Sequence, residues 1–232
     1  MARFKLFEEW CSEQINLNPL NSIRWGNPTL EKKKAATTPS PIVDWFLHQP
    51  NLWMELIESA PQNSSLTTQK ELVDLVDLMS KTTPEELLFA QRAEEDYLLL
   101  WEEFLQKHQI PVSRTILEHI EKQAEPLLFH LKDIINRPRP YQLAYYLGIK
   151  LYPLIHTDAS SASYPSGHSL NAHLIAEIMA QKYPQLASEI RSFGNKIAFS
   201  REQVGVHYPS DGAISEKIAH IIVTEKLMDV SL

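Results

Sequence analysis

Two histidines and an aspartate in the last third of the chain are residue types that move protons or attack electrophiles. His207 and Asp211 are four residues apart, so the carboxylate can accept a hydrogen bond from one imidazole nitrogen and leave the other free. His168 follows Ser166 and Gly167 at the predicted start of a helix. Each feature also has an ordinary structural explanation, namely an i,i+4 surface pair or a helix cap with an incidental histidine.

The turn before His168 is a candidate anion site. Pro165 fixes its own φ and favours extended backbone at Tyr164. Ser166 can cap the helix, and Gly167 allows a ligand to approach the backbone closely. The free N–H groups and the positive end of the helix dipole at such a position attract an anion.

Cations that could bind the same anion lie in two other clusters. Lys132 and Arg139 are seven residues apart around the end of a predicted helix, and Arg201 precedes His207 by six residues. Basic residues at a helix C-terminus more often only complement the dipole. The whole chain carries 22 Lys and Arg against 29 Asp and Glu, a net charge of -7. This balance argues against a nucleic acid or an anionic membrane as the main partner, and it requires a local cluster of cations for any anion chemistry.

Taken together, the three clusters resemble the signature of the type 2 phosphatidic acid phosphatase and vanadium haloperoxidase superfamily. Its three blocks are Lys-x6-Arg-Pro, Pro-Ser-Gly-His and Ser-Arg-x5-His-x3-Asp, and the matching residues are Lys132…Arg139-Pro140, Pro165-Ser166-Gly167-His168 and Ser200-Arg201…His207…Asp211. Within that family, residues 137–140 and 163–168 are most similar to the soluble bacterial class A non-specific acid phosphatases. Residues 1–110 contain nothing comparably specific.

The resemblance implies a metal-independent acid phosphatase that hydrolyses phosphate monoesters. Neutral His207 would attack phosphorus to form a phosphohistidine, and Asp211 would hold the proton of its other nitrogen. Protonated His168 would give its proton to the leaving oxygen and then activate water. The residues expected to bind phosphate are Lys132, Arg139, Ser166, Gly167 and Arg201. No cofactor is implied, the partner is a small phosphorylated substrate, and vanadate is expected to inhibit.

Two alternatives from other classes remain open on the sequence. A vanadium-dependent haloperoxidase would use the same pocket to hold vanadate as a cofactor, with His207 as its ligand and His168 as the acid–base residue. A helical protein that binds phosphate without catalysis would need neither histidine. Members of the membrane lipid-phosphatase branch would need membrane spans, and no stretch approaches the roughly 18 consecutive apolar residues of a span.

Several residues near the motifs receive no assigned role. His156 and Asp158 are the only additional metal-ligand candidates, and we interpret them as loop residues at the rim of the pocket. Asp133, Arg137 and Tyr164 are expected at the rim or behind the site.

The elements that must position these residues are predicted to be helices. Apolar residues recur at helical spacing, no alternating strand pattern of useful length occurs, and six Gly residues suit helices better than β-turns. The predicted helices cover approximately 41–48, 51–60, 64–79, 83–106, 113–136, 166–179, 184–204 and 210–227. Pro126 predicts a kink or break in the fifth of them, and the Pro-, Asn- and Thr-rich stretch through Asn27-Pro28 and residues 37–41 is predicted to be loop.

The expected fold is therefore all-α, a single-domain helical bundle of the acid phosphatase and vanadium haloperoxidase type. Residues 1–110 would form a helical N-terminal part and residues 111–232 the active-site core.

The composition, 44% hydrophobic and 22% charged, is that of an ordinary soluble globular protein. The acidic first 14 residues lack the apolar run of a signal peptide, which predicts a cytoplasmic protein as written, or a periplasmic or secreted one if a signal was trimmed. The single Cys11 excludes an intrachain disulfide. The oligomeric state is left open, with a homo-oligomer among the options.

Overall fold

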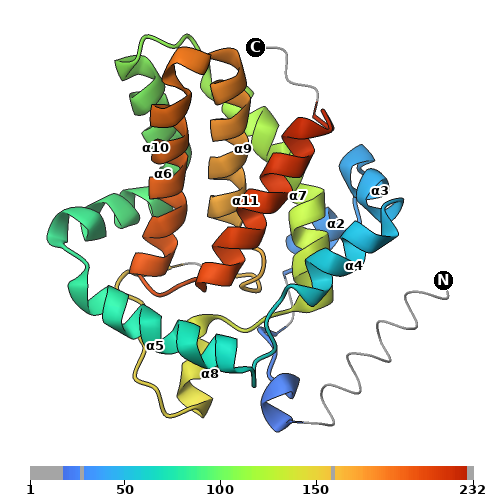
Figure 1. Cartoon of the computed structure of the whole chain (residues 1–232), viewed down its shortest axis with the longest axis vertical. Coiled ribbons are helices and arrows are strands. Elements are labelled where there is room, and N and C mark those ends of the chain that lie inside the picture. The colour runs from blue at the N-terminus through green and yellow to red at the C-terminus, as the bar shows by residue number, and fades with distance from the viewer. Residues whose placement is uncertain (1–17, 27–28, 158–159, 229–232) are drawn as a thin grey trace.

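The structure, a computed structural model, describes residues 18–26, 29–157 and 160–228. Cys11 and the acidic start of the chain lie outside these ranges. Within them the chain forms helices and no strand, which confirms the predicted all-α fold. In chain order (Figure 1), the α-helices are α2 (Leu30–Ala36), α3 (Pro41–Leu47), α4 (Pro50–Glu58), α5 (Leu66–Lys81), α6 (Pro84–Lys107), α7 (Arg114–Ile135), α8 (Pro140–Tyr146), α9 (Gly167–Lys182), α10 (Ala187–Gln203) and α11 (Pro209–Thr224). Short 3₁₀ turns cover Pro19–Ser22 and Pro184–Leu186.

Helix α9 lies at the centre of the bundle, between α10 and α11 (Figure 1). Eight consecutive residues, 169–176, are buried, so this helix is covered on every side rather than along one stripe. The residue that follows the Pro-Ser-Gly sequence, His168, is therefore carried by the most enclosed helix of the described structure.

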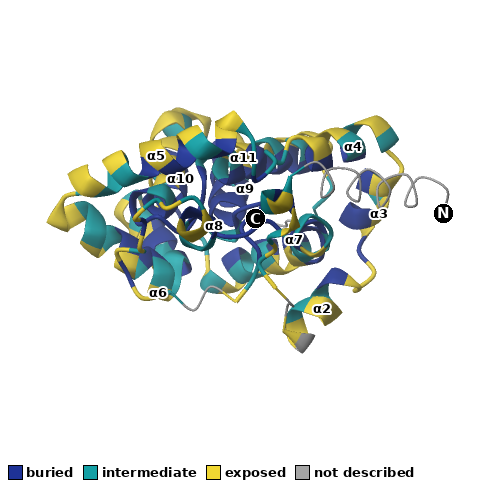
Figure 2. Ribbon diagram, turned by 90° about the horizontal axis from the view of Figure 1, so that it is seen from below, coloured by how far each residue is buried: buried dark blue, intermediate teal, exposed yellow. Residues whose placement is uncertain are grey.

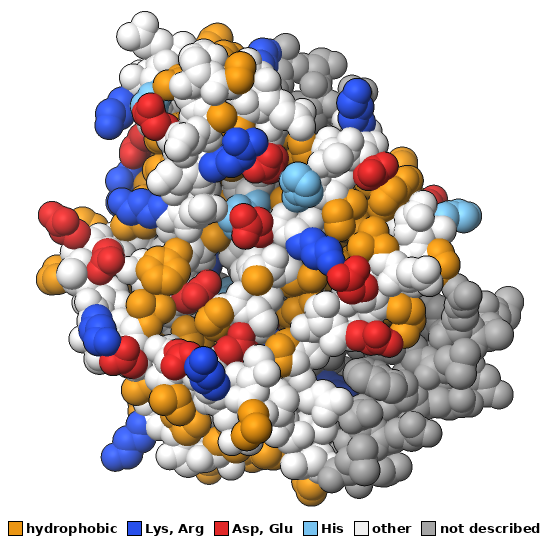
Figure 3. All heavy atoms as spheres, viewed as in Figure 1, with side chains coloured by type: hydrophobic (Ala, Val, Ile, Leu, Met, Phe, Trp, Pro, Cys, Tyr) orange, Lys and Arg blue, Asp and Glu red, His pale blue; other side chains and the backbone are white. Residues whose placement is uncertain are grey.

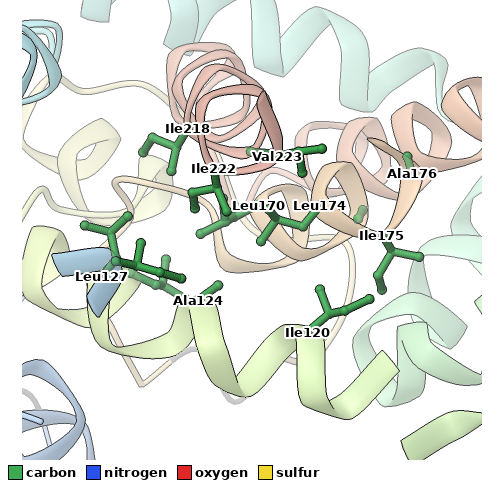
Figure 4. Packing of buried hydrophobic residues seen from close by; sticks show 14 of the residues in the cluster. Ile120, Ala124, Leu127, Leu170, Leu174, Ile175, Ala176, Ile218, Ile222 and Val223 are labelled. Carbon is green, nitrogen blue, oxygen red and sulfur yellow. The ribbon is translucent and has the colours of Figure 1, made fainter. Parts of the chain in front are cut away.

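The main hydrophobic core joins α7, α9 and α11 (Figure 4). On α7, Ile120, Ala124 and Leu127 recur at helical spacing and are fully buried. They face Leu170 and Leu174 of α9 and residues of α11, while α3 packs against α4 and α7. Buried residues concentrate in the middle of the molecule and exposed ones on the outer faces of the helices (Figure 2). Charged side chains of both signs are interspersed on the face shown in Figure 3.

Three of the longer helices begin at a residue whose side chain caps them. Thr83 and Glu86 form a capping box at the start of α6, and the side chain of Ser65 accepts a hydrogen bond from the backbone of Thr68 at the start of α5. Ser166 caps α9 in the same way. Local sequence therefore places these boundaries within about two residues.

Two long helices differ from the prediction. Of the kink or break expected at Pro126, no break occurs: α7 continues through this residue, which is buried. The interruption lies instead in α6 at Asp96, whose φ of -162° and ψ of 86° are not helical. The Asp96 carboxylate accepts a hydrogen bond from the backbone of Leu99 at 3.0 Å and pairs with Arg114 on α7 at 2.8 Å. These contacts replace helical ones, which the sequence of α6 alone does not reveal.

Two short helices were not predicted. Helix α2 forms where a loop was expected, because Thr29 caps it and Glu31 and Lys33–Lys34 complement its dipole. Helix α8 begins at Pro140, whose missing N–H is tolerated in a first turn.

We expect the Gly194→Ala substitution to separate α9 from α10. A Cβ atom at Gly194 would lie 2.9 Å from Cβ of Ala176 and 3.0 Å from the carbonyl oxygen of Ala172. Overpacking of this kind costs about 1–3 kcal/mol, more than the helix propensity of up to about 1 kcal/mol that alanine adds. Urea unfolding should show a lower free energy of unfolding by about 1–2 kcal/mol. Ser192→Ala, at an exposed position of the same helix, is the matched control and should stay within about 0.5 kcal/mol of the parent protein. Equal stability of the two variants would contradict the close approach of these helices.

Candidate active site

The N-terminus of α9 is tied to the N-terminus of α11. The backbone N–H of Ser166 donates to the carbonyl of Asp211 at 3.2 Å, and the Ser215 hydroxyl donates to the carbonyl of Ser166 at 2.9 Å. Helix ends more than 40 residues apart in the chain are thereby held at one place. This contact brings the Pro-Ser-Gly-His block and the His-x3-Asp block together.

A cavity of about 550 Å³ opens at this place, between α7, α9 and the loops that precede α8 and α9. Six of the eight predicted site residues line it: Lys132, Arg139, Gly167, His168, Arg201 and His207. The other two, Asp211 and Ser166, are fully buried behind its wall. The hydroxyl of Ser166 accepts hydrogen bonds from Ser169, which is a capping role, and its expected contact with phosphate remains a prediction.

The Asp211 carboxylate holds His207 in one tautomer. Oδ2 of Asp211 lies 3.1 Å from Nδ1 of His207 and also accepts from the Ser163 hydroxyl and, at 3.0 Å, the backbone of Tyr208. On the other side of the ring, Nη1 of Arg139 lies 2.7 Å from Nε2 of His207. A guanidinium can only donate, so Nε2 carries a lone pair and Nδ1 carries the proton. His207 is thus neutral, with a nucleophilic nitrogen directed at the cation-lined cavity.

The protonation states around His207 follow from burial and neighbouring charge. Burial alone would raise the pKa of Asp211, but Arg137 and the hydrogen bonds from His207 and Ser163 lower it below its usual value. Burial and the positive charge of Arg139 lower the pKa of His207 well below that of a free histidine, against the opposing effect of Asp211. The carboxylate is therefore ionised and the imidazole neutral.

Two of the three predicted cations of the cavity, Lys132 and Arg139, donate to backbone carbonyls. Nη1 of Arg139 donates to the carbonyl of Val206 at 2.9 Å and its Nε to that of Ser161 at 3.0 Å, while Nζ of Lys132 bonds the carbonyl of Ala162. Burial, with repulsion from Arg201, lowers the pKa of Arg139 to about 10.

Burial and Arg139 lower the pKa of Lys132 well below its usual value. Arg201 is 2% exposed, and within the described residues its Nε and Nη1 have no hydrogen-bond partner. Positive charge is thus concentrated in the cavity beyond what the surrounding protein groups neutralise, which favours binding of an anion.

His168 lies in the same cavity as His207. Its half-buried ring packs against the edge of Tyr97, with ring centroids 5.2 Å apart. Burial lowers the pKa of His168 well below that of a free histidine, and the positive charges of Arg201 and Arg139 lower it further. His168 is therefore neutral in the empty site, where the sequence interpretation has it protonated, and a bound anion would be needed to reverse this effect.

Two residues to which the sequence assigned no role complete the site. Glu94 on α6 pairs with Nη2 of Arg201 and accepts a hydrogen bond from Thr157 at 2.7 Å. It lies in an ordinary charged helical segment and carries no sequence signal. Arg137, noted without a role, is fully buried and donates to Asp211 at 2.7 Å. The sequence feature that could have indicated a role for Arg137 is its position two residues before Arg139, within Arg137-Pro138-Arg139-Pro140.

The other candidates that the structure describes do not line the cavity. Asp133 and His156 are exposed and do not line it, and Asp158 falls outside the described residues. Tyr164 is buried in the core and its hydroxyl donates to the carbonyl of Leu56 at 2.8 Å. In the described ranges, no three His, Cys, Asp or Glu side chains are grouped so that they could hold a metal ion.

Comparison with known proteins identifies the family of this region. Residues 123–224 match the family model of the PAP2 superfamily, and this segment contains all eight predicted site residues. Residues 123–224 thus belong to the PAP2 superfamily. A search against curated proteins found no match.

Among solved structures, the chain is similar to the first transmembrane PAP2-type phosphatidylglycerolphosphate phosphatase from Bacillus subtilis. The sequence identity is 18% and the TM-score 0.49, over 82% of this chain and 99% of that one. None of the helices in the described part of the present chain is long and apolar enough to cross a membrane.

We expect inorganic phosphate to stabilise the protein through these cations. A ligand that binds only the folded state at 100 times its Kd adds about 2.7 kcal/mol, which thermal unfolding detects as a higher Tm. Arg201→Gln should remove most of this increase. Lys217→Ala removes a cation of α11 that pairs with Glu55 of α4, and it should leave the phosphate-induced increase in Tm intact. A phosphate-induced rise in Tm that is equal in both variants would show that the anion binds elsewhere.

Proposed function

We propose that this protein is a metal-independent acid phosphatase that hydrolyses phosphate monoesters through a phosphohistidine on His207. The observation that carries the proposal is the neutral His207, with Nδ1–H on buried Asp211 and the lone pair of Nε2 directed at a cation-lined cavity. Membership of residues 123–224 in the PAP2 superfamily supports a phosphatase.

In the first step, Nε2 of His207 attacks phosphorus while the bond to the ester oxygen breaks in line. Arg139 must release Nε2 for this attack, and a phosphoryl oxygen is the natural new acceptor for its N–H. Lys132, Arg139 and Arg201, with the backbone N–H of Gly167, would stabilise the charge on the transferring phosphoryl group. Asp211 would stabilise the positive charge that develops on the imidazole.

His168 would move the proton in both steps. It donates to the leaving oxygen, which departs as an alcohol and leaves His168 neutral. It then takes a proton from water as water attacks phosphorus, the P–N bond breaks, and inorganic phosphate is released. His168 thus regains the proton that it takes up from solvent when the phosphate dianion binds, and it returns that proton to solvent when inorganic phosphate leaves.

The other charged residues of the cavity lining suggest which esters fit. Apart from Glu94, which pairs with Arg201, they are three carboxylates and two ammonium groups, namely Glu31, Glu121 and Glu125 against Lys32 and Lys122. Burial and the neighbouring Glu121 raise the pKa of Glu125, as expected where negative charge is in excess. This distribution favours small leaving groups that carry no further negative charge.

The reaction is tested by hydrolysis of p-nitrophenyl phosphate in the presence of EDTA. We expect activity without added metal and inhibition by vanadate that competes with substrate. His207→Ala should lose about 10³-fold or more in kcat. His168→Ala should lose about 10²–10⁴-fold, and His220→Ala, an exposed histidine on the same helix as Asp211, should keep full activity.

The same experiment distinguishes the alternatives. Halide oxidation by peroxide that requires vanadate, without phosphatase activity, would identify a haloperoxidase. Loss of activity in EDTA that zinc or magnesium restores would contradict the metal-independent mechanism. A His207→Ala protein as active as the parent would contradict the phosphohistidine.

The pH dependence tests the role of His168. In the free enzyme its pKa is lowered by burial and by the neighbouring arginines, and a bound phosphate dianion would raise it. The alkaline limb of kcat, which reports the complex, should therefore lie at higher pH than that of kcat/KM, which reports the free enzyme. His168→Asn should abolish the alkaline limb of kcat. A rate that continues to rise into the alkaline range would contradict an acid role for this histidine.

A further inference from the structure

A carboxylate from the N-terminal half of the chain lies behind the active site. Glu71 on α5 is 8% exposed and sits outside the segment that matches the PAP2 model. Its Oε1 accepts the backbone N–H of Ser210, in the first turn of α11, at 2.7 Å. Its Oε2 accepts from Nη2 of Arg137 at 3.0 Å.

Arg137 links this carboxylate to the catalytic one. Its Nη1 donates to Oδ1 of Asp211 and to the hydroxyl of Ser210, both at 2.7 Å. The guanidinium carbon lies 3.7 Å from the centre of the Tyr208 ring, so the group is fixed between a ring and two carboxylates. Glu71, Arg137, Asp211 and His207 thus form one continuous chain of contacts across α5 and α11.

The charges along these contacts affect the protonation of His207. If Arg137 faced Asp211 alone, the two charges would neutralise each other, and little negative charge would remain to stabilise a positive imidazole. With Glu71 included, the three buried charges sum to -1. Such charges interact strongly because the surroundings are of low dielectric.

The other charged groups near His207 are mostly positive: Lys132 from α7, Arg139 before α8, Arg201 from α10, with neutral His168 from α9. On the negative side, Glu202 of α10 lies near Asp211 and Glu71. Its burial and these two carboxylates raise its pKa to about 7, so around neutral pH it is only partly ionised. Glu71 is therefore the group that offsets Arg137.

We propose that Glu71 is a positioning residue for phosphoryl transfer, which fixes Arg137 and the start of α11 and leaves the charge of Asp211 available to His207. The inference rests on the proposed phosphohistidine mechanism. It also assigns a function to α5, because the part of the chain that lacks motifs then contributes to the chemistry.

Glu71→Gln is the decisive variant, because it keeps the shape and the acceptor for Ser210 but removes the charge. Loss of this negative charge disfavours protonated His207, so the pKa of His207 should fall. The acid limb of kcat/KM should move to lower pH, and kcat should fall about tenfold, while KM changes by less than about twofold. Glu71→Asp, which restores the charge, should recover part of kcat.

Histidine titration by NMR provides a readout that needs no activity. The His207 resonance, assigned by its absence in His207→Gln, should titrate at lower pH in Glu71→Gln than in the parent protein. Glu177→Gln removes a carboxylate from a more exposed pair with Arg191 and is the matched control. Its His207 titration and kcat should equal those of the parent.

Two results would overturn the proposal. One is a His207 titration that is the same in Glu71→Gln and the parent. The other is a loss of activity in Glu71→Gln that follows a loss of Tm, with both pH limbs unmoved, which would reduce Glu71 to a stabilising role. If the parent hydrolyses no phosphate ester but the His207 titration still shifts, the proposed function fails and the electrostatic link stands.

Discussion

The burial of one ionised carboxylate, that of Asp211, dictates the arrangement of the active site. A charge removed from water must be matched by donors with good geometry, or the fold is destabilised. Asp211 obtains four: Arg137, the Ser163 hydroxyl, the backbone of Tyr208 and Nδ1–H of His207. Only the last of these leads into the cavity.

The donors come from different parts of the chain, so satisfying Asp211 also assembles the site. Ser163 precedes α9, Arg137 follows α7, and His207 and Tyr208 precede α11. Arg137 and Ser163 therefore hold the first block and the segment just before the second block against the block that contains Asp211. The same contacts fix the tautomer of His207, so that a requirement of stability sets the direction of the nucleophilic nitrogen.

In the cavity in front of His207, positive charge is in excess. Its cations lie close together, so burial and repulsion from neighbouring cations lower the pKa of both Lys132 and Arg139. Without an anion this arrangement costs stability. An anion would find two N–H donors of Arg201 that have no partner among the described residues, and the donor that Arg139 directs at Nε2. The site is thus complementary to a charged ligand rather than to its own empty state.

The sequence by itself determined most of the helices and the three motif blocks whose side chains meet at the cavity. Apolar periodicity and capping residues such as Thr83 and Ser166 act within a few positions, so local reasoning could find the helices. The spacing of His207 and Asp211 likewise encodes their contact, because His207 lies just before the start of α11 and Asp211 lies in its first turn. Local sequence fails to predict helix continuity at Asp96 and Pro126. Helix α6 is interrupted where Asp96 pairs with Arg114 of α7, and α7 continues through Pro126, which is buried.

Only the tertiary structure decided which residues surround the motifs. Glu94 reaches Arg201 across 107 positions, and Glu71 reaches Arg137 across 66. Neither glutamate differs in its local sequence from a solvated residue on a helix, so no pattern could select it. Their roles arise because the bundle excludes water from these side chains, and a charge becomes functionally important only where water no longer screens it.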